Sequence, residues 1–171
     1  MLLKKGADVN VWGGPYGNAL QAASDQAGEV IVAMLLEKGA EVNAPGRAHV
    51  NALQLAINRD NKSVVAKLLD KGADVNARGG HYGNALHVAA VKGQLKIVEM
   101  LLKKGADITT HSGPYGNALQ AALIGAISGD GITDAASGVG FRILEVLLRK
   151  VAGIDAQDRP FSNTLQAAIF E

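Results

Sequence analysis

The chain has 171 residues, about the length of one domain, and its 17 Lys and Arg against 16 Asp and Glu leave a formal net charge of +1. This balance gives no reason to expect a nucleic acid or an anionic membrane as partner, and the absence of cysteine excludes disulfides, cysteine-ligated zinc and thiol nucleophiles. The longest apolar run, Val30 to Leu36, is far shorter than the ~20 residues that cross a bilayer. The first residues also lack the long apolar core of a secretory signal, so we expect an intracellular protein, cytoplasmic or nuclear.

In chain order, the first recurring element is a short helix that begins at an asparagine. The run Asn-Ala-Leu recurs every 33 residues, at Asn18, Asn51, Asn84 and Asn117. A fifth copy, Asn163-Thr-Leu, follows after 46 residues. Asparagine is a strong N-cap because its side chain accepts an unpaired backbone N–H of the first turn. The pattern predicts a first helix after each of these residues, through the Leu-Gln-Ala-Ala segment.

A second helix and a turn complete each unit. The second helix carries apolar residues at helical spacing, as in Ile97, Val98, Leu101 and Leu102. It is expected to end at a glycine in the left-handed conformation, at Gly39, Gly72 and Gly105. The Gly-rich stretch that follows predicts a hairpin-like turn. One unit cannot bury its own apolar face, so the units are expected to stack.

Three segments of one unit carry a specific pattern: Gly72-Ala-Asp-Val-Asn-Ala, Leu86-His87-Val-Ala-Ala-x-x-Gly93 and Ile97-Val98-x-x-Leu101-Leu102. On these residues the chain resembles the ankyrin repeat family over nearly its whole length. The resemblance implies an all-α solenoid of stacked helix-turn-helix units with hairpin-like turns. The family's Thr-Pro-Leu-His becomes Asn-Ala-Leu-Gln here. We expect the glutamines of this column to bond a neighbouring turn as the family histidine does: Gln21, Gln54, Gln120 and Gln166.

The run Gly-Gly-Pro-Tyr-Gly-Asn-Ala-Leu-Gln-Ala-Ala, which ends at Ala23 and again at Ala122 apart from its first glycine, resembles arrays common in fungal proteins. Such arrays are often appended to NACHT-type signalling proteins. No nucleotide-binding motif is present in this chain, so an NTPase domain would have to lie outside it.

The repeats predict a single array over residues 1–171. It comprises a partial unit over 1–17, units from Asn18, Asn51, Asn84 and Asn117, and a partial unit from Asn163. Thirteen extra residues, about 127–139, are expected to form a loop that either serves binding or reflects tolerated drift. Val151 replaces glycine at one helix end, where Gly153 is expected to take the turn. Neither end resembles a polar capping unit, so we expect either a fragment of a longer chain or self-association through the open ends.

Candidate catalytic and metal-binding groups are sparse. None of the four histidines (His49, His81, His87 and His111) pairs with another at i, i+4 on one helix, so we expect no metal and no cofactor. Acidic residues recur at Asp8, Glu41, Asp74 and Asp107, which indicates hydrogen bonding within each turn rather than a catalytic pair. An aromatic column at Tyr16, His49, Tyr82, Tyr115 and Phe161 indicates either a packing ladder or a stacking surface.

Partner-binding residues are expected where the repeat does not dictate the residue. In the ankyrin family, the turn tips and first-helix surfaces line a concave groove that meets partners. Carried over position by position, this gives a candidate surface of Trp12, Asp25, Gln26, Arg47, Asn58, Arg59, Arg78, His81, Val91, Lys92 and His111. Trp and Arg commonly anchor interfaces.

We therefore expect a non-catalytic protein–protein interaction module with an unidentified protein partner. One alternative is the C-terminal sensor region of an NTPase or other enzyme whose catalytic domain lies outside this chain. Another is a structural spacer whose open ends polymerise.

Overall fold

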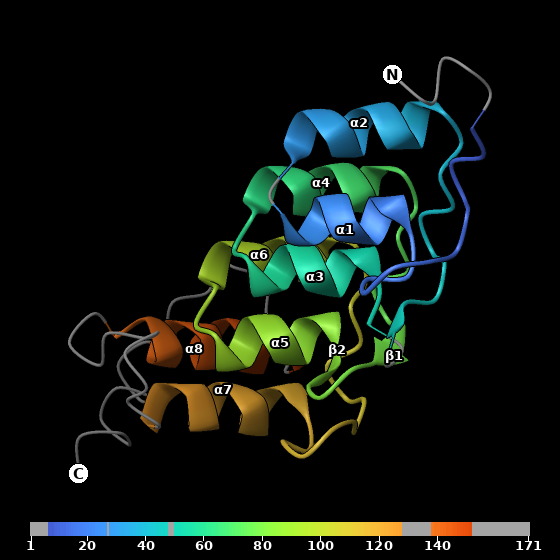
Figure 1. Ribbon diagram of the computed structural model, residues 1–171. Coiled ribbons are helices and arrows are strands. Elements are labelled where there is room, and N and C mark those ends of the chain that lie inside the picture. The colour runs from blue at the N-terminus through green and yellow to red at the C-terminus, as the bar shows by residue number, and fades with distance from the viewer. Residues whose placement is uncertain (1–6, 27, 48–49, 128–137, 152–171) are drawn as a thin grey trace, which may run out of the picture.

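A computed structural model describes residues 7–26, 28–47, 50–127 and 138–151. Helices dominate these residues: α1 (Ala19–Asp25), α2 (Glu29–Glu37), α3 (Ala52–Asn58), α4 (Lys62–Asp70), α5 (Ala85–Val91), α6 (Leu95–Lys103), α7 (Ala118–Ile127) and α8 (Val139–Val151). Two short strands, β1 (Arg78–Gly79) and β2 (Gly83–Asn84), pair antiparallel in one hairpin. Helices α1, α3, α5 and α7 pack in one row and α2, α4, α6 and α8 in a second, with the hairpin-like turns along one side (Figure 1). The predicted all-α solenoid is confirmed.

The first helices begin at the predicted asparagines. Asn18 and Asn51 each accept the N–H of the glutamine three residues later, at 2.9 Å in both units. Each glutamine side chain accepts the asparagine's backbone N–H in return, which completes a capping box. Asn84 caps α5 through the N–H of His87. The partial unit from Asn163 lies outside the described residues.

The same glutamine column also ties each unit to the next. Gln21 Nε2 donates to the carbonyl of Ala44 at 2.9 Å, and Gln54 Nε2 donates to the carbonyl of Gly79 at 3.1 Å. His87 occupies this position in the next unit, with its Nε2 2.9 Å from the carbonyl oxygen of Gly116. The expected bonds to a neighbouring turn are thus confirmed for Gln21 and Gln54.

The second helices end as predicted at left-handed glycines. Gly39, Gly72 and Gly105 have φ of 85°, 85° and 86°, where a side chain would be strained. Helix α8 differs, because it continues through Val151 and no positive φ is found at that residue. The expectation that Val151 does not take the left-handed turn is confirmed, whereas Gly153, which was expected to take it, lies outside the described residues. The inserted segment is described only at its borders.

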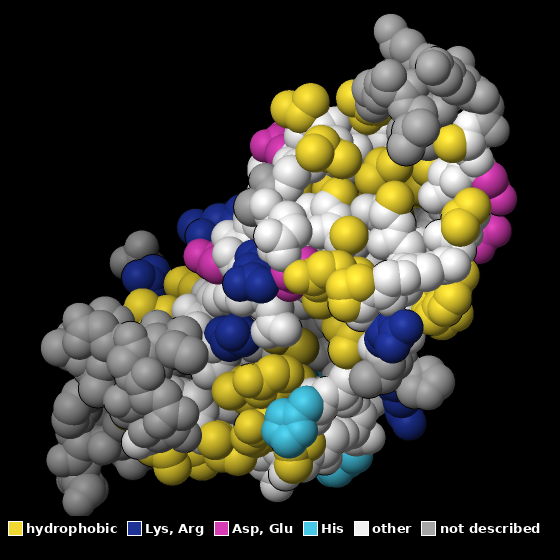
Figure 2. Space-filling view, viewed as in Figure 1, with side chains coloured by type: hydrophobic (Ala, Val, Ile, Leu, Met, Phe, Trp, Pro, Cys, Tyr) yellow, Lys and Arg dark blue, Asp and Glu magenta, His cyan; other side chains and the backbone are white. Residues whose placement is uncertain are grey.

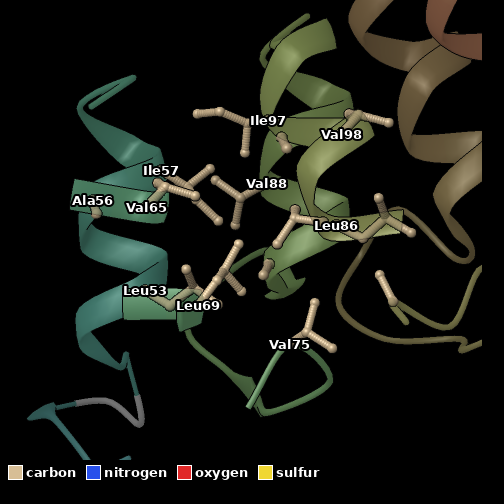
Figure 3. Packing of buried hydrophobic residues seen from close by; sticks show 14 of the residues in the cluster. Leu53, Ala56, Ile57, Val65, Leu69, Val75, Leu86, Val88, Ile97 and Val98 are labelled. Atoms are coloured by element: carbon tan, nitrogen blue, oxygen red, sulfur yellow. The ribbon is translucent and has the colours of Figure 1, made fainter. Parts of the chain in front are cut away.

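The core lies between the two rows of helices and consists of aliphatic side chains (Figure 3). Leu68, Ile97 and Leu101 are fully buried. Small residues let the helices approach each other closely: a Cβ at Gly125 of α7 would lie 2.3 Å from the carbonyl oxygen of Val91. The layers therefore stack without large aromatic side chains between them.

A second set of bonds joins the turns and was not predicted from the sequence. In three of the described turns an asparagine donates from Nδ2 to the carbonyl of the glycine that ends the next second helix; these pairs are Asn10 with Gly39, Asn43 with Gly72, and Asn76 with Gly105. The acidic residues bond within their own turns, as expected for Asp8, Asp74 and Asp107, each of which accepts the N–H of the residue two positions later. These hydrogen bonds therefore hold the turns in place, both within each unit and relative to the next unit.

Candidate partner-binding surface

The candidate residues at the turn tips are exposed. Trp12 is 55% exposed, and its ring lies over Gly17, where an added Cβ would come within 3.0 Å of the ring carbons. Because Gly17, with φ of 108°, has no side chain, the indole ring can lie directly against its backbone. Four further candidates at the tips are exposed: Arg47, Arg78, His81 and His111.

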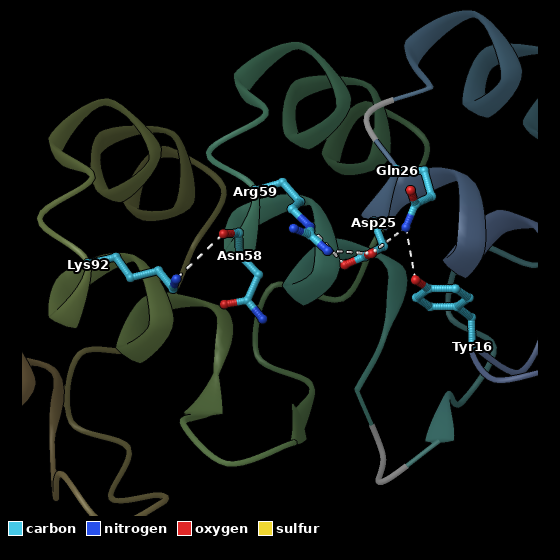
Figure 4. Close-up of polar contacts among 6 residues, drawn as sticks. All are labelled: Tyr16, Asp25, Gln26, Asn58, Arg59 and Lys92. Carbon is cyan, nitrogen blue, oxygen red and sulfur yellow. Dashed lines mark hydrogen bonds and ion pairs between the residues drawn. The ribbon is translucent and has the colours of Figure 1, made fainter. Parts of the chain in front are cut away.

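The remaining candidates line up at the C-terminal ends of the first helices. Asp25 and Gln26 come from the end of α1, Asn58 and Arg59 from the end of α3, and Val91 and Lys92 from the end of α5. Figure 4 shows Gln26, Asp25, Arg59, Asn58 and Lys92 as one row that crosses three units. The structure therefore brings together residues separated by 33 positions in the sequence.

Asp25 is the exception to the expected exposure. Its residue is only 7% exposed, so the expectation that Asp25 stands open to solvent is wrong. The physical reason is Arg59 of the next unit, whose Nε and Nη2 donate to the two carboxylate oxygens at 3.1 and 2.8 Å. These bonds hold the pKa of Asp25 below its usual value, against the opposing effect of burial. The side chain of Arg59 itself remains 54% exposed.

Aromatic side chains line the same face. The Tyr16 hydroxyl accepts a hydrogen bond from Gln26 Nε2 at 2.9 Å, so this ring lies along α1. Tyr82 and Tyr115 of successive units stack with ring centroids 5.7 Å apart. His81 meets both rings edge-on, at 5.3 and 6.1 Å. The expected packing ladder is confirmed for Tyr82 and Tyr115, while His49 and Phe161 lie outside the described residues.

A hollow of about 420 Å³ opens beside this aromatic group and was missed by sequence reasoning. Its walls include Tyr115, Pro114 and Gln120, together with Leu123 and Ile124 of α7. These residues come from the turn before α7 and from α7 itself, and no single sequence motif predicts that they line a hollow. Figure 2 shows the surrounding face: dark-blue Lys and Arg side chains at the ends of α3 and α5, and a cyan histidine among hydrophobic side chains lower down.

Within the described residues, no three His, Asp or Glu side chains are grouped so as to hold a metal ion. Burial lowers the pKa of His87, which is fully buried and bonded to the next unit. Across the described part of the chain, no helix has both the length and the apolar character needed to cross a membrane.

Comparison with known proteins agrees with this architecture. A family model described as ankyrin repeats in three copies matches residues 20–112, which is more than half of the chain. No curated protein matches the chain. The matched segment runs from Leu20 of α1 into the turn that follows α6, and it includes the capping Asn51 and Asn84 and the left-handed Gly39, Gly72 and Gly105. The chain belongs to the ankyrin repeat family.

Proposed function

We propose that this chain binds a partner protein through the candidate surface formed by the turn tips and the ends of the first helices. Ankyrin repeats are generally protein–protein interaction modules and are typically non-catalytic. The observation that carries the proposal is Trp12, which exposes more than half of its surface at a turn tip in a chain with a single Trp. Tryptophan anchors interfaces more often than most residues.

The hydrogen bonds between successive units support this role. Each unit is bonded to the next by the glutamine or histidine column and by the turn asparagines. A surface held in this way loses little conformational entropy when a partner docks. A typical interface buries about 800 Å² on each partner, which requires contacts spread over several of the stacked units.

The proposal is tested by affinity capture with three baits. The first is the wild-type chain, and the second carries Trp12→Ala, Arg47→Ala and Arg78→Ala. The third is a matched control with one apolar and two cationic exposed residues replaced on the second-helix side: Val30→Ala, Lys38→Ala and Lys71→Ala. We expect one protein to be retained by the wild type and the control and lost by the tip variant. Equal retention by all three baits would contradict the proposal.

A second candidate function rests on the Gly-Gly-Pro-Tyr-Gly-Asn-Ala-Leu-Gln-Ala-Ala run, which resembles fungal arrays appended to NACHT-type signalling proteins. In this alternative the array is the sensor region of an intracellular NTPase whose catalytic domain lies outside this chain. A transcript that encodes a phosphate-binding loop upstream of Met1 would support it. Self-association through the open ends is a third arrangement, and a mass that rises with protein concentration would support that one.

A further inference from the structure

The candidate surface differs in charge from the rest of the molecule. It carries four cationic side chains, Arg47, Arg59, Arg78 and Lys92, against one carboxylate, Asp25. The remaining described residues have equal numbers of cationic and anionic side chains. Resting on the proposed function, we propose that the partner presents an extended acidic peptide segment whose carboxylates are received by these four side chains.

The cationic groups are available for such contacts. Arg47 and Arg78 are exposed at the tips, and neither guanidinium forms a hydrogen bond or ion pair with another described residue. Lys92 Nζ has one long contact, 3.5 Å to the carbonyl oxygen of Asn58. Arg47, Arg78 and Lys92 can therefore turn to a carboxylate without giving up a strong existing bond.

The single carboxylate of the surface does not oppose an acidic partner. Asp25 is held by two bonds from Arg59, and its side chain is only 8% exposed. The same bonds use Nε and Nη2 of Arg59 and fix the plane of its half-exposed guanidinium. Because an arginine carries five N–H donors, the group still has donors for a second carboxylate. Asp60, which follows Arg59, is itself paired with Lys62 at 2.7 Å.

The repeat sets the spacing that the partner needs. Arg59 and Lys92 follow α3 and α5, which are neighbours in one row. Packed helices lie about 8–10 Å apart, and three residues of a peptide in the extended polyproline II conformation rise about 9.3 Å and return the side chain to the same face. A peptide that crosses the row at right angles to the helices would thus present one carboxylate to each unit at every third residue.

A nucleic acid is the other polyanion to consider, and the observations favour a peptide. The turns that carry the cationic tips also carry exposed carboxylates, such as Asp74, four residues before Arg78. A nucleic acid backbone is charged at every nucleotide, so it would also meet these carboxylates. A peptide with carboxylates at chosen positions would meet only the cations.

The test uses the whole chain and fluorescein-labelled peptides followed by anisotropy. The acidic probe has Glu residues separated by Gly-Ser pairs, and its control has Gln at the same positions. The surface variant is Arg47→Gln/Arg78→Gln/Lys92→Gln, and the charge-matched control is Lys38→Gln/Lys71→Gln/Lys103→Gln, in which all three lysines are exposed on the second-helix side. Arg59 is left intact because its loss would unpair buried Asp25.

We expect the Glu probe to bind at least about tenfold more tightly than the Gln probe, and its affinity to fall as NaCl rises from about 50 to about 500 mM. The surface variant should lose this preference and the control variant should keep it. Equal affinity for both peptides, equal losses in both variants, or tighter binding of a single-stranded oligothymidylate would overturn the inference.

The outcome is separable from that of the proposed function. If the protein captured through Trp12, Arg47 and Arg78 stays bound at high salt and is not displaced by the Glu peptide, the acidic-segment inference fails while the interaction surface stands. If no protein depends on those residues, the proposed function fails as well.

Discussion

The bond that Gln54 makes to the next unit provides the sharpest test of how the array is held together. Gln54 is 2% exposed, and its side chain accepts the N–H of Asn51 while donating to the carbonyls of Gly79 and Gly83. Gln120 forms the same capping box with Asn117, but its side chain is exposed, and among the described residues it has no bond to another unit. Within the described part of the chain, the two glutamines thus differ in their bonds between units and in burial.

This difference sets the expected magnitudes. A hydrogen bond contributes about 0.5–1.5 kcal/mol net, and a buried group left unpaired costs about 1–3 kcal/mol. We expect Gln54→Ala to lower the free energy of unfolding by about 2–4 kcal/mol, because it removes the bond that the Gln54 side chain accepts from the N–H of Asn51 and both bonds that it donates to the next unit. Gln120→Ala removes the bond that its exposed side chain accepts from the N–H of Asn117 and should cost about 0.5–1 kcal/mol.

Urea unfolding followed by far-ultraviolet circular dichroism measures both values, with a common slope m as the check that the two variants unfold in the same way. Equal costs for Gln54→Ala and Gln120→Ala would refute the reasoning, because the bonds between units would then contribute nothing measurable.

Three further predictions address the core, the buried histidine and the ion pair. Leu68→Ala should lower the free energy of unfolding by about 2–5 kcal/mol in the same urea assay, since Leu68 is fully buried. The double variant Trp12→Ala/Arg78→Ala should change the free energy of unfolding by less than about 1 kcal/mol. A larger loss in the tip variant than in Leu68→Ala would mean that the tip and core residues are misassigned. His87→Gln restores the residue found at this position in other units and should stay within about 1 kcal/mol of wild type, while His87→Ala should cost about 2–3 kcal/mol; equal losses would show that the bond to Gly116 is unimportant. Because Arg59 keeps the pKa of Asp25 below its usual value in the folded state, the pair contributes stability above the unfolded pKa of about 4 and loses it as pH falls through the folded pKa. The deficit of Asp25→Asn relative to wild type should therefore be present at pH 7 and disappear on acidification, and a deficit that is constant with pH would contradict this assignment.

Much of the scaffold follows from local rules in the sequence. Asparagine as N-cap and glycine as left-handed C-cap are decided within one turn of chain, and Asn51 and Gly72 behave as the spacing predicts. The glutamine bonds to the next turn were also predictable, because the repeat places a long polar side chain beside each neighbouring turn.

Contacts that depend on the meeting of two units were harder to predict. Asp25 is buried because Arg59, thirty-four residues later, reaches back over it. Taken alone, an aspartate or an arginine at the end of a helix is what an ordinary exposed helix end carries. A pairing of acidic and basic residues at the repeat offset was the signal that could have found this contact. The turn asparagines Asn43 and Asn76 repeat just as regularly, but their two-sided bonding becomes visible only once the units stack.

The most direct test of the account is hydroxyl-radical footprinting of the chain with and without its captured partner. Trp12, His81 and His111 are exposed at the tips, while Val30 and Ile31 are exposed on α2, 76% and 54% respectively. We expect the partner to protect the three tip residues and to leave Val30 and Ile31 as reactive as before. Protection of α2 with unchanged reactivity at the tips would contradict the claim that partners bind the turn tips and first-helix ends.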